Sequence, residues 1–260
     1  MTKIKLAFQG EKGAYSHIAC TEIFKDAEIK NCKTFEETFK TAFDDETYKA
    51  VIPIENSLAG RVADIHYLLP KFKLQIYAEH YQVVEHCLLV KNETELRDVK
   101  YVRSHAQAIG QCQEIIKKNN FKSIISADTA GSAKDLAESS DNSIAAIASE
   151  LAAATYGLKI LKKNIEDEAG NVTRFLVMGK NISQPEYDKN KKYITTCIFR
   201  LKSEASALYK SLGGFAINQI NLTKLESFSV KNSFEQVNFY LDIEGHIEQK
   251  PVQKSLEELG

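Results

Sequence analysis

The sequence predicts an α/β protein that ends in a smaller α+β module. Two observations predict this. Strand patterns alternate with helical patterns up to about residue 156, and such alternation indicates a mostly parallel sheet, or two of them. After a polar segment at 180–192 the order becomes strand, helix, strand, strand, helix. That order is the start of a ferredoxin-like βαββαβ unit.

The first three predicted strands are each followed by a helical pattern. The strands are expected at 3–9, 27–32 and 49–54, and the helices begin near residues 14, 34 and 58. Thr34 and Glu37 have the spacing of a capping box, which indicates where the second helix begins. Pro70 is expected to end the third helix, because proline interrupts helical hydrogen bonding.

A β-rich stretch at 74–90 separates this series from a second one. It is long enough for two strands, or for one segment that crosses between two lobes. The second series has strands at 100–103, 122–126 and 144–148, with helices at 93–99, through 109–116, from 129 and at 150–156. Gly157 is predicted to close the last of these helices as a left-handed residue.

The polar segment at 180–192 is predicted to be a linker. Beyond it we expect strands at 193–201, 216–229 and 234–244, with helices at 205–213 and 251–259. The last strand of a βαββαβ unit is missing from this series. We therefore expect either a truncated sequence or a sheet edge that a partner subunit completes.

Composition and charge exclude several classes of function. The 260 residues include 34 basic and 35 acidic side chains, so the basic surface that binds a nucleic-acid backbone is missing. No stretch reaches about 18 consecutive apolar residues and no apolar leader is present, which predicts a soluble, cytoplasmic protein without membrane contact. The five cysteines contain no C-x-x-C pair and the six histidines share no helical face. We expect neither a disulfide framework nor a metal site.

Short polar clusters follow four predicted strands and open the next helix. They are Gln9-Gly10, Glu55-Asn56-Ser57, Ser104-His105 and Asp128-Thr129. Helix N-termini attract anions, and open α/β sheets bind ligands at the carboxyl ends of their strands. The clusters therefore predict a carboxylate site, although the same residues also suit plain helix caps. Arg174, beside Phe175, suits either carboxylate recognition or a structural salt bridge.

Five motifs spread along the chain carry a family resemblance. They are Phe8-Gln9-Gly10 with Gly13-Ala14-Tyr15-Ser16, Pro53-Ile54-Glu55-Asn56-Ser57-Leu58-Ala59-Gly60, Ser104-His105 through Gln111-Cys112, Asp128-Thr129-Ala130-Gly131-Ser132-Ala133, and Asn171-Val172-Thr173-Arg174-Phe175. Almost end to end, the chain resembles prephenate dehydratase, the lyase that converts prephenate into phenylpyruvate, water and carbon dioxide in phenylalanine biosynthesis. Its C-terminal part resembles an ACT domain, the phenylalanine-sensing module of this family, through Ala207-Leu208-Tyr209 and Ile220-Asn221-Leu222-Thr223-Lys224-Leu225-Glu226-Ser227.

The resemblance implies a domain organisation. A catalytic domain at 1–180 would have two α/β lobes in a periplasmic-binding-protein-like arrangement, and an ACT regulatory domain would occupy 193–260. Lobe one would combine 1–77 with 158–180, and lobe two would take 78–157. ACT domains commonly pair through their sheet edges, which implies a homodimer or homotetramer. The family needs no cofactor and no metal.

The resemblance also assigns functional residues. Catalytic roles fall on Thr173, Asn56, Ser104 and Gln111. Substrate binding falls on Glu55, Ser57, Thr129, Arg174 and Phe175, and phenylalanine binding on Ala207, Leu208, Asn221, Leu222, Glu226 and Ser227. Thr173 would donate a hydrogen bond to the departing hydroxyl of prephenate while Asn56 and Gln111 orient the substrate. His105 is a rival acid.

Two other functions fit the same motifs. Arogenate dehydratase performs the same elimination on an aminated substrate, and a non-enzymatic dicarboxylate-binding or sensing protein could share the fold. The regulatory part also departs from the family pattern. Ser206 stands where the family usually has glycine, and Phe228-Ser229 where it has arginine and proline. These departures weaken the expected inhibition by L-phenylalanine.

Overall fold

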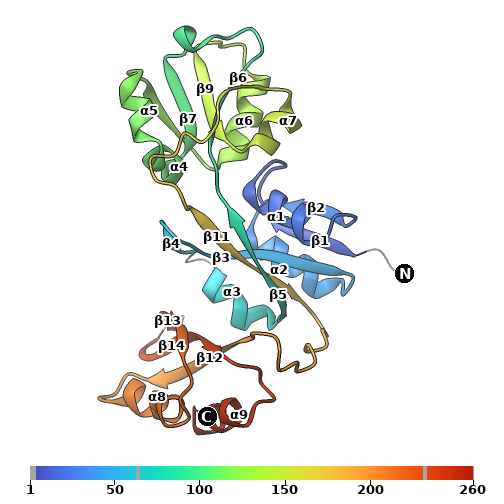
Figure 1. Cartoon of the computed structure of the whole chain (residues 1–260), viewed down its shortest axis with the longest axis vertical. Helices are drawn as coiled ribbons and strands as arrows, with labels where there is room; N and C mark the ends of the chain where they lie inside the picture. Colours follow the sequence, from blue (N-terminus) through green and yellow to red (C-terminus); the bar gives the residue numbers. More distant parts are fainter. Residues whose placement is uncertain (1–3, 63–64, 231–232, 260) are drawn as a thin grey trace. The chain divides into compact units, whose positions relative to one another are not determined.

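The computed structural model describes residues 4–62, 65–230 and 233–259 (Figure 1). They form two units, Met1–Ile182 and Ser183–Gly260. The first unit contains two sheets and the second contains one. Each unit has its own apolar core, and the two units are described separately below.

The first sheet has the strand order β2-β1-β3-β11-β5, with β4 paired to β3. Its strands are β1 (Lys5–Gln9), β2 (Glu28–Cys32), β3 (Tyr48–Asn56), β4 (Gly60–Arg61), β5 (Gln75–Val83) and β11 (Val172–Gly179). β1 runs parallel to β2 and β3, whereas β11 is antiparallel to β3 and β5. The sheet is therefore mixed. β11 comes from a part of the chain far from the other strands of this sheet.

Helices cover both faces of the first sheet. α1 (Tyr15–Ile23) packs on the face formed by Leu6, Phe8 and Phe175. α2 (Phe35–Asp44) packs against β1 and β3, and its start confirms the predicted cap: Thr34 Oγ1 accepts from the N–H of Glu37 at 3.1 Å. The carboxylate of Glu37 accepts in turn from the N–H of Lys33.

The helix predicted to begin at residue 58 starts later. Residues 57–59 form a tight turn between β3 and β4, and α3 runs from Ile65 to Phe72. The prediction that Pro70 ends this helix is also wrong, because Pro70 lies inside its last turn. Proline removes only its own N–H donor, so the residues after it can complete a turn.

The second sheet has the strand order β10-β6-β9-β7-β8. Its strands are β6 (Cys87–Val90), β7 (Tyr101–His105), β8 (Lys122–Ser126), β9 (Ile144–Ala148) and β10 (Lys159–Lys162), and its helices are η1 (Leu96–Asp98), α4 (Ala106–Gln111), α5 (Gln113–Lys118), α6 (Thr129–Glu138) and α7 (Glu150–Tyr156). Alternate residues of β6 and β9 enter two cores: Leu88 and Ile147 pack with α4 and α5, and Leu89 and Ala146 with α6 and α7. Gly157 closes α7 at φ 67°, as predicted.

The chain passes between the two sheets at places that differ from the predicted lobe boundaries. All of β5, through Val83, pairs with β11 in the first sheet. β10 pairs with β6 in the second sheet. Residues 78–83 therefore belong with the first sheet and 159–162 with the second. The predicted boundaries were wrong here because a β-rich stretch does not reveal which sheet its strands join.

The second unit folds in the predicted order of strand, helix, strand, strand, helix. Its elements are β12 (Ile194–Lys202), α8 (Ala207–Ile217), β13 (Leu222–Val230), β14 (Ser233–Glu244) and α9 (Lys250–Leu259). β14 lies between β12 and β13 and is antiparallel to both. Phe215 of α8 and Val252 of α9 pack on Leu241 and Ile243 of β14, so both helices cover one face. α8 extends over residues 216–217, which were predicted to begin a strand.

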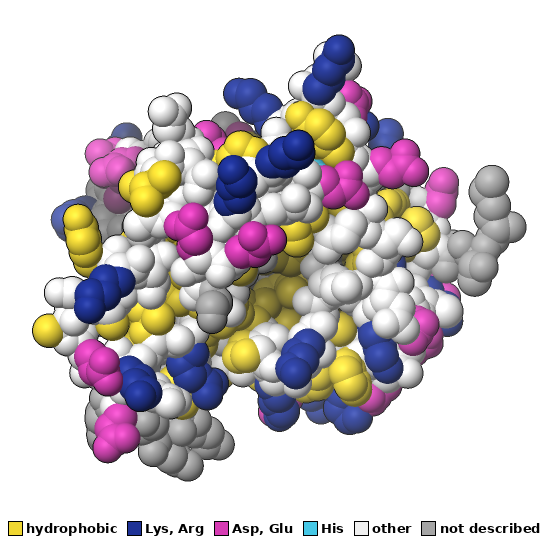
Figure 2. All heavy atoms as spheres, turned by 90° about the horizontal axis from the view of Figure 1, so that it is seen from below, with side chains coloured by type: hydrophobic (Ala, Val, Ile, Leu, Met, Phe, Trp, Pro, Cys, Tyr) yellow, Lys and Arg dark blue, Asp and Glu magenta, His cyan; other side chains and the backbone are white. Residues whose placement is uncertain are grey.

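The surface carries both signs of charge in similar amounts. On the face drawn in Figure 2, basic and acidic side chains of the described residues are interspersed, with apolar side chains between them. This agrees with the formal net charge of -1. Among the described residues, no helix is both long enough and apolar enough to cross a membrane.

Candidate active site

A β-bulge in β3 determines which side chains stand beside Thr173. The pairs along β3 and β11 are Asn56 with Thr173, Glu55 with Arg174, and Pro53 with Phe175, so Ile54 is an extra residue. A bulge of this kind shifts the alternation of side chains by one position. A regular ladder would set Glu55 opposite Thr173. The bulge instead places Asn56 on the face of Thr173 and turns Glu55 to the face of Arg174.

A chain of side-chain amides leads from Thr173 to the second sheet. Asn56 Nδ2 donates to Thr173 Oγ1 at 2.9 Å and to Asn171 Oδ1 at 2.6 Å. Asn171 Nδ2 donates to Gln111 Oε1 at 2.9 Å. Gln111 is the last residue of α4. This series of hydrogen-bonded side chains therefore connects both sheets of the first unit. It brings together Thr173, Asn56 and Gln111, three of the four residues predicted to be catalytic.

The backbone fixes the orientation of the Asn56 amide. Asn56 Oδ1 accepts from the N–H groups of Leu58 and Ala59 at 3.1 and 2.8 Å. A backbone N–H only donates, so the other end of this amide must be the NH₂ group that faces Thr173. Thr173 Oγ1 is therefore the acceptor in this bond. Within the described part of the chain, the hydroxyl of Thr173 donates no hydrogen bond.

His86 and Tyr15 continue the chain beyond Gln111. His86 Nε2 lies 3.0 Å from Gln111 Oε1, and His86 Nδ1 lies 2.8 Å from the hydroxyl of Tyr15. The His86 N–H donates to the Glu166 carboxylate at 2.9 Å. His86 is 2% exposed, and this burial lowers its pKa, against the opposite effects of the Gln111 hydrogen bond and Glu166. Burial also raises the pKa of Tyr15 well above its usual value. Both groups are thus neutral near pH 7.

His86 was not predicted from the sequence to belong to the site, and Tyr15 and Asn171 were noted only as parts of motifs. His86 lies immediately before β6, at the passage between the sheets, where no helix or strand period indicates its partners. Tyr15 opens α1 and Asn171 precedes β11. Only the tertiary fold brings these positions together. In the structure, Asn171 stands out as a polar side chain that is only 1% exposed.

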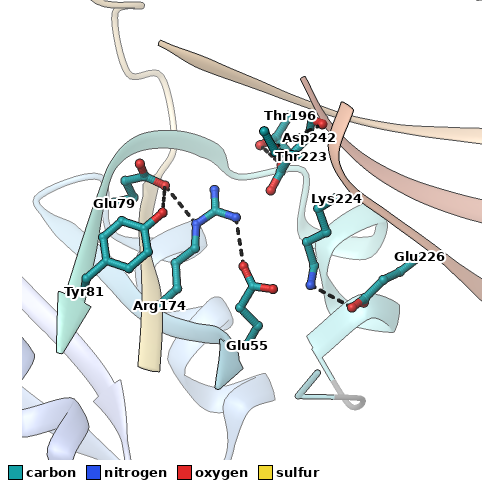
Figure 3. Close-up of polar contacts among 9 residues, drawn as sticks. All are labelled: Glu55, Glu79, Tyr81, Arg174, Thr196, Thr223, Lys224, Glu226 and Asp242. Carbon is teal, nitrogen blue, oxygen red and sulfur yellow. Dashed lines mark hydrogen bonds and ion pairs between the residues drawn. The ribbon is translucent and has the colours of Figure 1, made fainter. Parts of the chain in front are cut away.

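Arg174 lies on the opposite face of β11, where it already has two carboxylate partners (Figure 3). Its Nε donates to Glu79 at 2.8 Å and its Nη1 to Glu55 at 3.1 Å. Tyr81 also donates to Glu79, at 3.4 Å. A guanidinium between two carboxylates presents little positive potential to a further anion. The geometry favours the salt-bridge interpretation of Arg174 and does not bring Arg174 or Glu55 together with Thr173.

The other predicted substrate-binding residues have different surroundings. Ser57 holds the segment before β11, since its hydroxyl donates to the carbonyl of Gly170 and accepts from the N–H of Val172. Phe175 is a core residue that packs with Leu6 and Phe8. Thr129 opens α6, which is capped by Asp128 through a 2.6 Å hydrogen bond to the N–H of Gly131.

Ser104 is buried within the second sheet. Its hydroxyl donates to the carbonyl of Ile147 at 2.6 Å, and the residue is 0% exposed. It makes no hydrogen bond to Thr173, Asn56 or Gln111 within the described structure. His105, the rival acid, caps α4 by accepting from the N–H of Gln107 at 3.3 Å. The structure thus gives Ser104 a bond to the neighbouring strand β9 (Ile144–Ala148) and His105 the cap of α4.

The loop after β1 forms a second connection between the two sheets. Ser149, the N-cap of α7, donates from its hydroxyl to the carbonyl of Gly13 at 2.6 Å and accepts from the N–H of Ala152. Tyr156 donates to the carbonyl of Lys12 at 2.9 Å. Gly13 has φ +90°, and a Cβ there would lie 2.6 Å from the Cα of Ala152. Only glycine allows this close approach.

The residues predicted to bind phenylalanine lie in the second unit. Ala207 and Leu208 open α8, Asn221 precedes β13, and Leu222, Glu226 and Ser227 lie on β13. Ser206, where the resemblance implies glycine, has φ +66°. The left-handed conformation explains why glycine suits this position. Glu226 accepts a 2.7 Å hydrogen bond from Lys224 (Figure 3). Among the described residues of the whole chain, no group of histidine, cysteine and acidic side chains could hold a metal ion.

The fold and the site together define a class of protein. A mixed α/β unit with a polar junction between two sheets matches solved structures of prephenate dehydratases. The chain belongs to the prephenate dehydratase family, whose family model matches residues 6–183.

Individual relatives match the chain beyond these residues. The bifunctional N-acyl-homoserine lactone acylase/prephenate dehydratase of Komagataeibacter europaeus is 39% identical over 98% of this chain and 90% of its own length. Arogenate dehydratase/prephenate dehydratase 2 of Arabidopsis thaliana is 35% identical over 99% of this chain and 70% of its own. A structure of prephenate dehydratase from Arthrobacter aurescens in complex with L-Phe covers 98% of this chain and 85% of its own, with a TM-score of 0.89 and 27% identity.

Proposed function

We propose that the protein is a prephenate dehydratase, which converts prephenate into phenylpyruvate, water and carbon dioxide. One observation carries the proposal beyond family membership. Thr173 accepts a hydrogen bond from Asn56, and in the described structure its own hydroxyl donates no hydrogen bond. A hydroxyl held in this way can donate to a bound substrate oxygen.

The reaction needs little from the protein besides position and a hydrogen-bond donor. The ring carboxylate of prephenate leaves as carbon dioxide, and its electron pair enters the ring. The hydroxyl on the opposite ring carbon departs and takes up one proton to become water, while the ring becomes aromatic. A hydrogen bond from Thr173 to the departing oxygen stabilises the charge that develops there, and such assistance is worth about 10²- to 10⁴-fold. Asn56 and Gln111 hold this donor in place.

The carboxylates of the substrate need other partners than Arg174. Because Arg174 is paired with Glu55 and Glu79, we assign capture of the dianion to the backbone N–H groups at helix N-termini of the first unit. Thr129, at the start of α6, stays a candidate for this role. The formal net charge of -1 means that capture depends on local donors and not on a long-range field.

We further propose that residues 1–180 form the two-lobed catalytic domain and residues 193–260 an ACT regulatory domain that binds L-phenylalanine. The β-α-β-β-α order of the second unit supports this assignment, as does the relative crystallised with L-Phe. Pairing of ACT domains through sheet edges would give a homodimer or homotetramer. Calorimetry with L-phenylalanine, alongside activity curves, tests the assignment; no heat of binding and unchanged activity would contradict it.

The decisive experiment is incubation of the purified chain with prephenate and detection of phenylpyruvate and carbon dioxide. Thr173→Val preserves the shape of the side chain and removes the hydroxyl, so we expect turnover to fall by at least about a hundredfold. Thr21→Val is the matched control, because among the residues that the structure describes the hydroxyl of Thr21 bonds to the carbonyl of Ile18 within α1. Turnover near that of the unsubstituted protein in Thr173→Val would remove Thr173 from the mechanism.

Two alternatives are separated by the same assay. An arogenate dehydratase would turn over arogenate faster than prephenate, and the Arabidopsis thaliana relative is named for both activities. A dicarboxylate-binding protein would bind prephenate without releasing carbon dioxide. The hydroxyl of Thr173 serves the ring chemistry of either substrate, so only the comparison of turnover distinguishes the two enzymes.

A further inference from the structure

We infer that His86 is a positioning residue for the candidate active site, and that its neutral form carries the proton on Nε2. The inference rests on the proposed function for its catalytic consequence, but the protonation state follows from hydrogen-bond geometry alone. His86 is the next group after Gln111 in a continuous series of hydrogen bonds.

 

The direction of donation is set at the far end of this chain. Because the N–H groups of Leu58 and Ala59 donate to Asn56 Oδ1, the NH₂ group of Asn56 faces Asn171 and must meet an oxygen there. The amide of Asn171 then turns its own NH₂ group toward Gln111. Gln111 therefore presents its oxygen both to Asn171 and, at 3.0 Å, to His86 Nε2. An oxygen that accepts requires a donor, so Nε2 carries a hydrogen.

The other ring nitrogen faces Tyr15. In the neutral imidazole Nδ1 has no hydrogen, and it can accept from the hydroxyl of Tyr15 at 2.8 Å. The same hydroxyl lies 2.7 Å from the carbonyl of Glu85. If His86 takes up a proton, Nδ1 donates to Tyr15 and the hydroxyl of Tyr15 donates to Glu85. Nε2 donates to Gln111 in both charge states, so the orientation of the amide chain does not depend on this titration.

The ionisable groups around the Tyr15–His86 pair come from several elements. Glu85 precedes His86, Glu166 lies between β10 and β11, and Cys87 and Cys112 belong to β6 and to the junction of α4 with α5. Glu166 accepts from the backbone N–H of His86 and leaves both ring nitrogens to Tyr15 and Gln111. The ring is thus held at both nitrogens and the backbone of His86 is held by Glu166, so the ring keeps the Gln111 amide from turning over.

The catalytic consequence concerns the hydroxyl hydrogen of Thr173. If Gln111 turned its NH₂ group toward Asn171, the amides of Asn171 and Asn56 would lose their partners in sequence, and Asn56 would no longer hold Thr173 as an acceptor. The hydrogen of Thr173 would then no longer be directed to the substrate. Misplacement of one group in a chain of this kind can lower a rate by tenfold or more, up to about a hundredfold.

The first test needs no substrate. In the full chain with ¹⁵N-labelled histidine, NMR above the pKa of His86 should show Nε2 protonated and Nδ1 unprotonated. The opposite tautomer would overturn the inference. Because this measurement does not involve turnover, its outcome is independent of whether the protein is a dehydratase.

The second test uses two substitutions of similar size. Glutamine places an amide nitrogen as many bonds from Cα as Nε2, whereas the amide nitrogen of asparagine corresponds to Nδ1. We expect His86→Asn to lower kcat for prephenate by at least about tenfold and His86→Gln to recover most of that loss. A purely structural role would lower both variants alike, and equal kcat values in the two variants would overturn the inference.

The unsubstituted protein and Thr173→Val separate this inference from the proposed function. If the unsubstituted protein releases no carbon dioxide from prephenate, the proposed function fails and the NMR result still decides the tautomer. If it is active and Thr173→Val is inactive, but His86→Asn keeps full kcat, the proposed function stands and the positioning role of His86 fails.

Discussion

At the scale of single residues, Ser206 conflicts with its own backbone. Its φ of +66° lies in the left-handed region, where a side chain costs about 1–2 kcal/mol relative to a right-handed conformation. Ser206 is the residue before α8 and makes no side-chain cap there. The position therefore carries backbone strain without a compensating hydrogen bond from its hydroxyl to the helix.

We expect Ser206→Gly to raise the free energy of unfolding of the second unit by about 1 kcal/mol, because glycine adopts this φ without strain. Ser211→Gly is the control, since it places glycine inside α8 and should lower the free energy by about the same amount. Urea titration of the full chain measures both. Destabilisation by Ser206→Gly would contradict the assigned strain.

The pKa of buried His86 predicts how stability changes with pH. Burial lowers this pKa in the folded protein, so the unfolded chain binds the proton more readily. Stability is then fully present above the unfolded pKa of about 6.5 and decreases as the pH falls below it, by at most about 1.4 kcal/mol per pH unit for one group. In urea titrations between pH 7 and 5, the free energy of unfolding of His86→Gln should decrease less steeply than that of the unsubstituted protein. An equal dependence of the unfolding free energy on pH in both proteins would show that the pH dependence does not come from His86.

At the scale of elements, the bulge in β3 separates two kinds of residue. Asn56 and Thr173 share one face, and Glu55 and Arg174 share the other. Removing one partner of a buried ion pair typically costs about 3–5 kcal/mol. The structure thus predicts different consequences for neighbouring positions of the same strand, Thr173 and Arg174.

We expect Arg174→Met to lower the free energy of unfolding by about 3 kcal/mol, because it removes the guanidinium that pairs with both Glu55 and Glu79. Glu79→Gln is the control and should cost less, since one carboxylate still pairs with Arg174. Urea titration measures stability, and kcat for prephenate is measured where both variants are folded. A hundredfold loss of kcat in folded Arg174→Met would show that the guanidinium serves the reaction after all.

The loop at Gly13 predicts a second effect at this scale. Gly13→Ala should destabilise the first unit by about 2 kcal/mol or more, because the added Cβ meets the backbone of Ala152 and the φ of +90° disfavours alanine. Gly157→Ala is the control: its φ is +67°, but no atom lies within 4 Å of the added Cβ. Equal unfolding energies for the two variants would show that the contact with α7 contributes little.

The sequence predicted most of the elements but not the contacts of the site. Periodicity located β9, α7 and the capped start of α2, because these elements bury regular apolar faces. It placed a helix at residue 58, where a hairpin forms instead, since Leu58 stands at helical spacing from later residues and yet is exposed. It also gave no indication of the bulge at Ile54, which depends on pairing with a strand more than a hundred residues away.

At the scale of the whole molecule, the two units have separate cores. If residues 1–180 are catalytic as proposed, we expect a fragment of residues 1–182 to keep most of the kcat for prephenate and to lose any response to L-phenylalanine. The full chain measured in parallel is the control. A folded fragment without turnover would show that the second unit contributes to the active site.

The position of β11 has a consequence for synthesis of the chain. β11 lies between β3 and β5 in the first sheet but follows every strand of the second sheet in sequence. As the chain emerges from the ribosome, the second sheet can close once β10 has appeared, while β3 and β5 still have open edges. Open strand edges pair readily with other chains. The arrival of β11 ends this exposure, and the same event brings Thr173 to Asn56.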